Sequence, residues 1–353
     1  MNQTRAILCV LGACLLIVAG VFLIRYYFYE RKTMDQKTDP AAQPVSWIAR
    51  LDELTKTKSS GVFTAKDKQG KPVLLEWQKL TMQSPDFSKI MREVCDLACA
   101  AYTPVEVAFL KVFTDSTVPA TPFNSISPFA SGGATEDRHD EREGIKVREE
   151  YCAPFDRLFK TSSAQDQADW EKFKQALAAK NWKRVAALMP VVIKQIYVMD
   201  YAAFAKAGFG IANRHFFVTA KDGETGKLLG FVEFFVTPNY PAGDIKCSSF
   251  AVAPEAQNRG LGKLLMSSIF KIVPECKRIF LSTRITNDVA RRAYTAWGFV
   301  PDTNPIQEPF FKQNPAHWMF FEYKVDSCSK LQEAAKYLVE TQGSRESAAP
   351  FMA

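Results

Sequence analysis

Metal-binding and disulfide-exchange patterns are missing from this sequence. It has eight cysteines but no CxxC pair, and none of its three histidines joins cysteines at the spacing of a zinc site. Cys95 and Cys99 lie four residues apart on an expected helix, which permits a redox pair or half a metal site; small residues on one buried helix face are the commoner origin of such spacing. We therefore predict no metal centre, and reduced thiols as in a cytosolic setting.

Nucleotide fingerprints and runs of one charge are missing too. There is no GxGxxG and no GxxxxGK[ST], which argues against a nicotinamide-binding domain and a P-loop NTPase. The net charge is +7 over 353 residues, but lysines and arginines are scattered, so we expect no nucleic-acid partner. The remaining composition, 47% hydrophobic and 24% charged, is that of a globular chain with a sizeable core and no internal repeat.

The N-terminus carries a long apolar run. Residues Ala6–Ile24 are 19 consecutive apolar or glycine positions, close to the ~20 that cross a bilayer as a helix. We predict a transmembrane anchor within residues 1–29. The alternatives are a cleaved secretory signal, whose apolar region spans only about 7–15 residues, a lipoprotein signal ending at Cys14, and a buried N-terminal helix.

Charges flanking this run set an expected orientation. Arg5 precedes the run, whereas Arg25, Arg31 and Lys32 follow it. Since positive charge is enriched on the cytoplasmic side of single spans, we expect a single-pass membrane protein whose main domain faces the cytoplasm.

The rest of the chain divides by composition. Residues 30–60 are polar and read as a tether, and a folded domain is expected over 61–325. Within it, about 114–150 is an irregular insert and about 164–208 holds extra helices. Strand and helix patterns then alternate to a last strand, and 326–353 is predicted to be a helix and tail.

A glycine-bearing turn interrupts that alternation. The stretch PEAQNRGLGKLL places Gly260 and Gly262 between a strand and a helix. Glycines ahead of a helix permit backbone angles that other residues rarely adopt, and they leave N–H groups accessible at the positive end of the helix dipole. Arg259 and Lys263 add charge at the rim, so the turn is typical of an anion cradle, although a plain tight turn has the same pattern.

Two motifs together resemble the GNAT superfamily of N-acetyltransferases. Gln257 to Gly262 matches its Q/R-x-x-G-x-G/A signature. The second pattern, N-x-x-A-x-x-x-Y-x-x-x-G-F, is reproduced at full spacing by Asn287, Ala290, Tyr294, Gly298 and Phe299. The resemblance spans about Gly61 to Val325. It implies an α/β (α+β mixed-sheet) acyl-CoA N-acyltransferase fold with an inserted loop and helical segment.

The resemblance also implies acetyl-CoA as the acyl donor and an amine as the acceptor. By position, the cofactor diphosphate would be held by the glycine turn, made of Gln257, Asn258, Arg259, Gly260, Leu261, Gly262 and Lys263. The preceding strand is expected to separate from its neighbour and to contact the pantetheine arm through Phe250, Ala251 and Val252, with Asn287 on the other side.

Direct attack of an amine on a thioester needs an oxyanion donor, an acid and a base. The Val252 N–H is expected to be the donor. Tyr294 occupies the family's general-acid position, and a phenol of pKa ~10 can protonate a thiolate of pKa ~8.5 within hydrogen-bond reach. Packing of the helix is the other role open to Tyr294.

The sequence identifies the general base less clearly than the general acid. Many relatives carry a carboxylate on the strand before the glycine turn, and KCSSFAVAP has none. Glu233 shares a strand face with Leu229, Phe231 and Phe235, so we expect a raised pKa and a role as base; an outward strand position or a water chain are the alternatives. His215 and His317 are expected to be ordinary strand residues.

The leading hypothesis is therefore a membrane-tethered N-acetyltransferase. The alternatives are a non-catalytic acyl-CoA-binding or protein-interaction module on the same scaffold, and a transferase of longer acyl groups. The acceptor stays open among peptide, polyamine, antibiotic and sugar amines.

Overall fold

The computed structural model describes residues 46–56, 58–114, 141–199, 201, 212–303 and 317–341. The predicted anchor at residues 1–29 lies outside these ranges. Within them one helix, α3 (Pro85–Thr114), is long and apolar enough to cross a membrane. It also packs along α6 (Trp182–Val198) and against the sheet, with Val94, Ala98 and Leu110 fully buried, as a core helix does.

In the described ranges, nine strands form one mixed sheet in the order β7-β8-β6-β5-β4-β3-β2-β1-β9. The strands are β1 Ser60–Lys66, β2 Pro72–Leu80, β3 Arg214–Asp222, β4 Leu228–Val236, β5 Asp244–Val252, β6 Arg278–Arg284, β7 Val300–Pro301, β8 Trp318–Lys324 and β9 Val339–Glu340. Only β5 and β6 pair in parallel. The mixed sheet expected from the sequence is therefore present.

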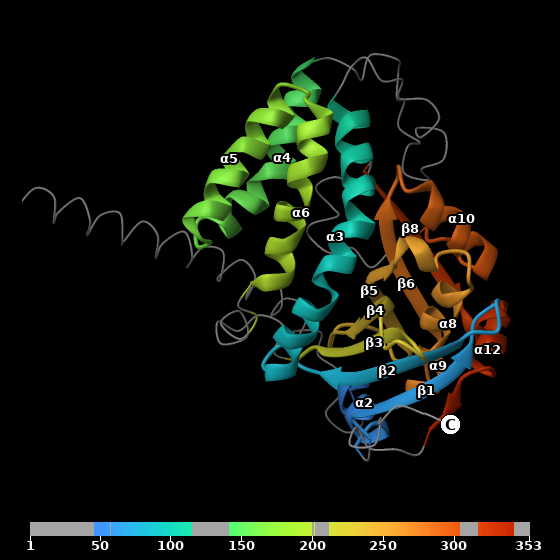
Figure 1. Ribbon diagram of the computed structural model, residues 1–353. Helices are drawn as coiled ribbons and strands as arrows, with labels where there is room; N and C mark the ends of the chain where they lie inside the picture. Colours follow the sequence, from blue (N-terminus) through green and yellow to red (C-terminus); the bar gives the residue numbers. More distant parts are fainter. Residues whose placement is uncertain are drawn as a thin grey trace, which may run out of the picture. The chain divides into compact units, whose positions relative to one another are not determined.

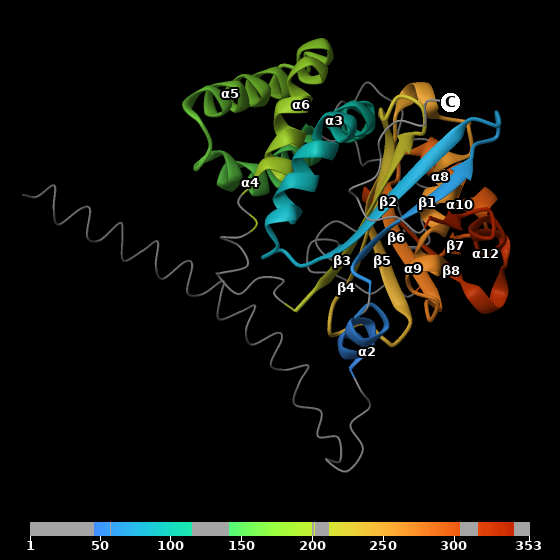
Figure 2. The ribbon, with the colours of Figure 1, turned by 60° about the horizontal axis from the view of Figure 1, so that its bottom comes forward.

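Helices cover both faces of this sheet (Figures 1 and 2). They are α2 Trp47–Leu54, α3 Pro85–Thr114, α4 Glu141–Phe159, α5 Ala164–Ala178, α6 Trp182–Val198, α8 Leu261–Ser267, α9 Ile269–Ile272, α10 Asp288–Trp297 and α12 Lys330–Ala335. Helices α3 to α6 pack together on one side, and α8 and α12 pack together on the other.

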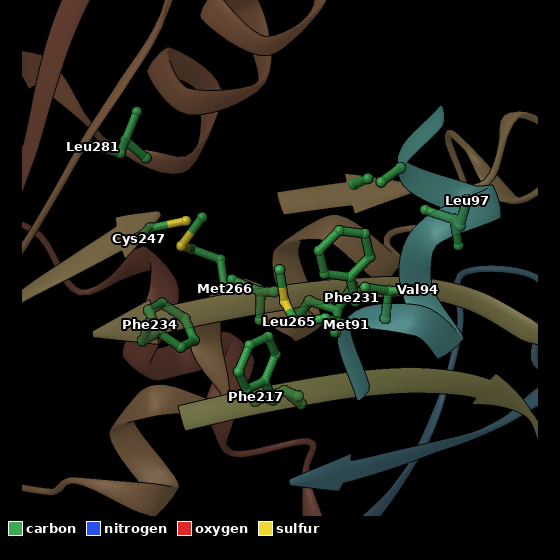
Figure 3. Packing of buried hydrophobic residues seen from close by; sticks show 14 of the residues in the cluster. Met91, Val94, Leu97, Phe217, Phe231, Phe234, Cys247, Leu265, Met266 and Leu281 are labelled. Carbon is green, nitrogen blue, oxygen red and sulfur yellow. The ribbon is translucent and has the colours of Figure 1, made fainter. Parts of the chain in front are cut away.

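Neighbouring residues of the central strand β4 face these two layers in turn. Phe231 meets the ring of Tyr197 on α6, with ring centres 6.4 Å apart, while Gly230 faces Leu265 on α8. Figure 3 shows Met91 and Val94 of α3 close to Phe231. The apolar alternation of one strand therefore builds two cores, one on each face of the sheet.

The structure differs from the sequence prediction at three segments. Helix α2 buries Trp47 and Leu51, and the Trp47 indole N–H donates to the Asp244 carbonyl at 3.1 Å, so the predicted tether over 30–60 ends at the folded region by Trp47. The predicted irregular insert is helical from Glu141 onward. After Val325 the chain forms the short helix α12 and then pairs as β9 with β1.

The first difference has a physical cause. An amphipathic piece of eight residues has no stability alone, but it folds when it packs against the starts of β3 and β5. The extra helices expected over about 164–208 are present as α5 and α6. Helix α6 packs on α3, and α5 packs on α4 and α6. Through α3 this helical layer lies against β5, the strand that precedes the glycine turn.

Candidate active site

Strands β5 and β6 separate part-way along their length. They pair from Asp244 with Arg278 as far as Cys247 with Leu281, and no further. Beyond that point a cavity of about 1830 Å³ opens between residues 248–252 and 281–284. The separation expected for the strand before the glycine turn is therefore present.

Main-chain groups of β5 point alternately toward β4 and toward this cavity. The Ala253 N–H donates to the Leu229 carbonyl on β4 at 2.8 Å. Since hydrogen-bonded pairs alternate along an antiparallel ladder, Ala251 also bonds to β4, whereas Phe250 and Val252 face the cavity. The expectation that Ala251 offers its main chain to a pantetheine arm is thus wrong, because β4 already uses it.

Tyr102 on α3 was missed by the sequence analysis. Its hydroxyl accepts from the Phe250 N–H at 2.9 Å and donates to the Phe250 carbonyl at 3.1 Å. Burial raises the pKa of Tyr102, so the phenol keeps its proton. The two residues are 148 positions apart, and no local pattern announces their contact.

The glycine turn lines the opposite end of the cavity. Its seven residues, Gln257, Asn258, Arg259, Gly260, Leu261, Gly262 and Lys263, all contribute to the wall. Gly260 takes a left-handed backbone with φ +84°, and Asn258 does so with φ +64°. The Lys263 N–H bonds to the Gly260 carbonyl at 3.1 Å. The N–H groups of Leu261 and Gly262, at the start of α8, have no acceptor within the helix, so the turn has the geometry expected of an anion cradle.

At Gly262 there is also no room for a side chain. A Cβ there would lie 2.9 Å from the Trp297 ring and 3.1 Å from the Phe250 ring. The aromatic side chains that wall the cavity therefore depend on a missing side chain in the turn.

Arg259 does not supply a rim charge. Its Nε donates to Asp67 Oδ2 at 2.7 Å, and both side chains are at least nine-tenths buried. The Lys68 N–H also donates to the Arg259 carbonyl at 2.9 Å. Burial raises the pKa of Asp67, but hydrogen bonds from Arg259 and from the N–H groups of Lys71 and Gln69 outweigh burial and leave that pKa below its ordinary value. The β1–β2 turn thus clamps the glycine turn.

Tyr294 lies on the cavity wall at the centre of an aromatic group. It is 5% exposed and packs against Phe250, Trp297, Phe299 and Phe321. Burial raises its pKa well above the ordinary value, so the phenol is protonated at neutral pH. Tyr294 therefore has a packing role and is also protonated, as a general acid must be.

Asn287 begins the helix that carries Tyr294. Its Oδ1 accepts from the Ala290 N–H at 3.2 Å and its Nδ2 donates to Thr283 Oγ1 at 3.1 Å. Gly298 ends the helix with φ +98°. Asn287 lines the cavity, but both ends of its amide already hold α10 in place.

Glu233 lies behind the cavity wall. It is 7% exposed and is absent from the described residues that line the cavity. Its Oε1 is 2.8 Å from His215 Nδ1, and Ser248 Oγ donates to its Oε2 at 2.5 Å. Burial raises the pKa of Glu233, but His215 and the hydroxyls of Ser248 and Ser249 offset burial and lower it overall. The predicted raised pKa is wrong, because the apolar strand pattern did not reveal these partners.

The far end of the cavity is aromatic and holds one ion pair. The Arg284 guanidinium lies 3.9 Å from the Phe109 ring centre and 4.1 Å from that of Trp318, and it bonds both oxygens of Glu106. Burial and the nearby Arg284 lower the pKa of His317 to about 4. His317 is therefore an aromatic wall residue, uncharged at neutral pH.

The Cys99 thiol on α3 is held by a hydrogen bond to α6. Burial raises the pKa of Cys99 to about 12, and its Sγ–H donates to the Pro190 carbonyl at 3.4 Å, so it is no reactive thiol. In the described ranges, no three His, Cys, Asp or Glu side chains are grouped to hold a metal ion.

The model of the acetyltransferase (GNAT) family matches residues 147–299, which include the glycine turn, the separated strands and α10. Residues 147–299 therefore carry the pattern of a GNAT acetyltransferase domain. Such a domain is that of an N-acetyltransferase, with acetyl-CoA as its acyl donor. No curated protein matches the chain significantly.

Solved structures similar to this domain include three acetyltransferases. An acetyltransferase of the family from Staphylococcus aureus is 17% identical, with 31% of this chain and 68% of that chain covered and a TM-score of 0.27. Mutant forms of the spermidine/spermine N-acetyltransferase of Vibrio cholerae are 20% identical (38% and 76%, TM-score 0.28). A protein assigned as a streptothricin acetyltransferase of Bacillus anthracis, in complex with acetyl coenzyme A, is 17% identical (31% and 62%, TM-score 0.26).

Proposed function

We propose that this GNAT domain transfers the acetyl group of acetyl-CoA to a primary amine by direct attack, with Tyr294 as general acid. The observation that carries the proposal is the position of a protonated, buried phenol on the wall of a cavity that also holds the glycine turn. A membrane anchor at Ala6–Ile24 would hold the domain at the cytoplasmic face, where acetyl-CoA is made available.

Acetyl-CoA would lie along the cavity from the glycine turn to the aromatic end. The diphosphate would take N–H groups of the turn between Gln257 and Lys263, and the pantetheine arm would follow the side of β5 that Val252 presents. Support for this orientation comes from the bare, left-handed Gly260 and from the main-chain alternation of β5. Asp67 supports it indirectly, because it keeps Arg259 out of the cradle.

The reaction would then take place in the cavity by direct attack of the amine on the thioester. The amine nitrogen forms a bond to the thioester carbon, and the Val252 N–H stabilises the oxyanion. When the carbon–sulfur bond breaks, the thiolate takes the Tyr294 proton. The raised pKa keeps the Tyr294 phenol protonated, and the proton moves to the sulfur as negative charge develops there within hydrogen-bond reach.

The acceptor would enter from the aromatic end. Two of the similar structures are named for a polyamine and for an antibiotic of the streptothricin group. In this chain the wall there combines Phe109, Trp318 and the Glu106–Arg284 pair, which suits a cationic amine with an apolar body.

Tyr294→Phe tests the acid. We expect kcat to fall roughly 10²-fold or more, since general acid catalysis contributes that much, while acetyl-CoA binding measured by calorimetry stays unchanged. Tyr240→Phe, which removes a buried phenol outside the described cavity wall, is the matched control. Equal kcat in both variants would reject the acid role, and acetyl-CoA binding without thiol release for any amine would favour the non-catalytic module.

Membrane attachment needs a separate test. The full chain should sediment with membranes and stay there in alkaline carbonate, whereas a chain starting at Ser46 should not. Protease added outside intact cells should leave the domain uncut. Release of the full chain by carbonate would reject the anchor and leave the enzyme proposal unaffected.

A further inference from the structure

A β-bulge places two serines opposite one buried carboxylate. Along the β4–β5 ladder Glu233 pairs with Ser249 and Phe234 pairs with Cys247, so Ser248 is an extra residue on β5. Bulges of this kind re-aim side chains and are frequent beside active sites. Here both serine hydroxyls bond to the Glu233 carboxylate, that of Ser248 at 2.5 Å.

Ser248 connects the cavity with the protein interior. Ser248 is exposed and lines the cavity at the point where β5 and β6 separate. Glu233 is buried behind it. A proton that reaches the Ser248 hydroxyl from the cavity therefore has a carboxylate within hydrogen-bond distance on the other side.

His215 holds the second carboxylate oxygen from within an aromatic box. Its ring contacts Phe87 edge-on at 4.9 Å and stacks with Phe217 and Phe235. Its Nε2 is buried with no hydrogen-bond partner in the described part of the chain. A second ring proton would be buried without an acceptor, so the geometry favours a neutral ring with its proton on Nδ1, donated to Glu233.

We propose that Ser248, Glu233 and His215 form a proton relay that deprotonates the acceptor amine. The inference rests on the proposed acetyl transfer and supplies the base that it needs. Ser248 would touch the substrate. Glu233 and His215 are positioning residues that act through Ser248.

The proton count of the relay is balanced. As the amine nitrogen bonds to the thioester carbon, it loses one proton to Ser248 Oγ, and Ser248 passes its own proton to Glu233 Oε2. Ser248 ends as a neutral hydroxyl, and Glu233 changes from carboxylate to carboxylic acid. The reverse transfer through Ser248 returns the proton to water after the amide leaves.

Kinetics of the full chain test the relay, with acetyl-CoA and the best acceptor from spermidine, ethanolamine and an N-terminal peptide amine. We expect Ser248→Ala and Glu233→Gln to lower kcat roughly 10²-fold. Ser267→Ala, which removes a buried hydroxyl outside the described cavity wall, should leave kcat within about twofold.

The pH profile separates a relay from simple packing. His215→Phe keeps an aromatic ring but removes the donor, so the acid limb of kcat should move up by about one pH unit or more. His215→Asn keeps an N–H donor and should restore the limb to lower pH. Equal limbs in both variants would overturn the relay.

Two further readouts distinguish the possible failures. Nitrogen-15 spectra of labelled histidine should show a neutral Nδ1–H ring that is lost in His215→Asn and altered in Glu233→Gln; a ring protonated on Nε2 alone would overturn the inference. Acetyl-CoA binding with unchanged kinetics in Ser248→Ala would reject the relay alone. Absence of acetyl-CoA binding in the unmodified chain would reject the proposed function and the relay with it.

Discussion

The two ends of the cavity are built by different means. At the glycine end, neighbouring turns are joined through main-chain groups and the buried Arg259–Asp67 pair. At the far end, side chains from α3, β6 and β8 pack around Arg284. A short motif announces the first end, whereas the second depends on residues brought together by the sheet and its helices. A local motif therefore identifies one end of this site, whereas the complete site also depends on tertiary packing.

The largest expected effect comes from Asp67→Ala at the glycine end. The change leaves the Arg259 guanidinium buried without its carboxylate, and breaking such a pair costs about 3–5 kcal/mol. Urea unfolding should report that loss, together with weaker acetyl-CoA binding. Asp222→Ala, in the exposed β3–β4 turn, is the comparison variant. A loss no larger than that of Asp222→Ala would contradict the clamp.

Gly262→Ala should have the next largest effect. The added Cβ would press on the Trp297 and Phe250 rings, and overpacking of this kind costs about 1–3 kcal/mol. Acetyl-CoA affinity should fall because these rings wall the cavity. Gly262 does not have a left-handed backbone. Gly226→Ala, where φ is +71° and a Cβ would meet no atom, is the opposite case, with backbone strain and no crowding. Unchanged affinity and stability in Gly262→Ala would show that the rings move aside.

Tyr102→Phe should have a smaller effect than the two changes in and beside the glycine turn. It removes the hydroxyl that bonds the N–H and carbonyl of Phe250, which costs about 1–2 kcal/mol for the groups left unpaired. If this hydroxyl orders β5 for acetyl-CoA, KM for acetyl-CoA should rise while kcat changes little. A change in kcat alone would place Tyr102 in the chemical step instead.

His317→Phe, at the far end, should give the smallest effect. The pKa of His317 is about 4 in the folded chain, against about 6.5 in an unfolded one. As pH falls from 6.5 toward 4, the unfolded chain binds a proton that the folded chain does not, so stability decreases across that window. Without the imidazole, acid unfolding should begin at lower pH. An unchanged acid midpoint would mean that other groups set it.

Local chemistry made much of the fold predictable. The hairpin of β3 and β4, the strand into the glycine turn, and the helix between Asn287 and Gly298 follow from alternation, capping and left-handed glycines. The segment at Trp47–Leu54 was predicted to be part of a tether because its own pattern is short. Only packing against the ends of β3 and β5 makes it a helix.

The candidate site shows the same limit in its charges. Arg259 and Glu233 were judged from their neighbours in sequence, as a rim cation and as an acid on an apolar face. Each is neutralised or hydrogen-bonded by a residue from another strand or turn, Asp67 in one case and His215 in the other. Electrostatics depends on distance in space, so sequence spacing carries little information about it.

By itself the sequence determined the family motifs, the glycine turn with its backbone requirements, and the alternating strands and helices, because these depend on contacts within a few residues. The tertiary structure alone decided which main-chain groups of β5 face the cavity, that Tyr102 meets Phe250, and that Ser248, Glu233 and His215 share one hydrogen-bonded cluster. Pairing register and a single bulge set those contacts, and both depend on strands that lie far apart in the chain.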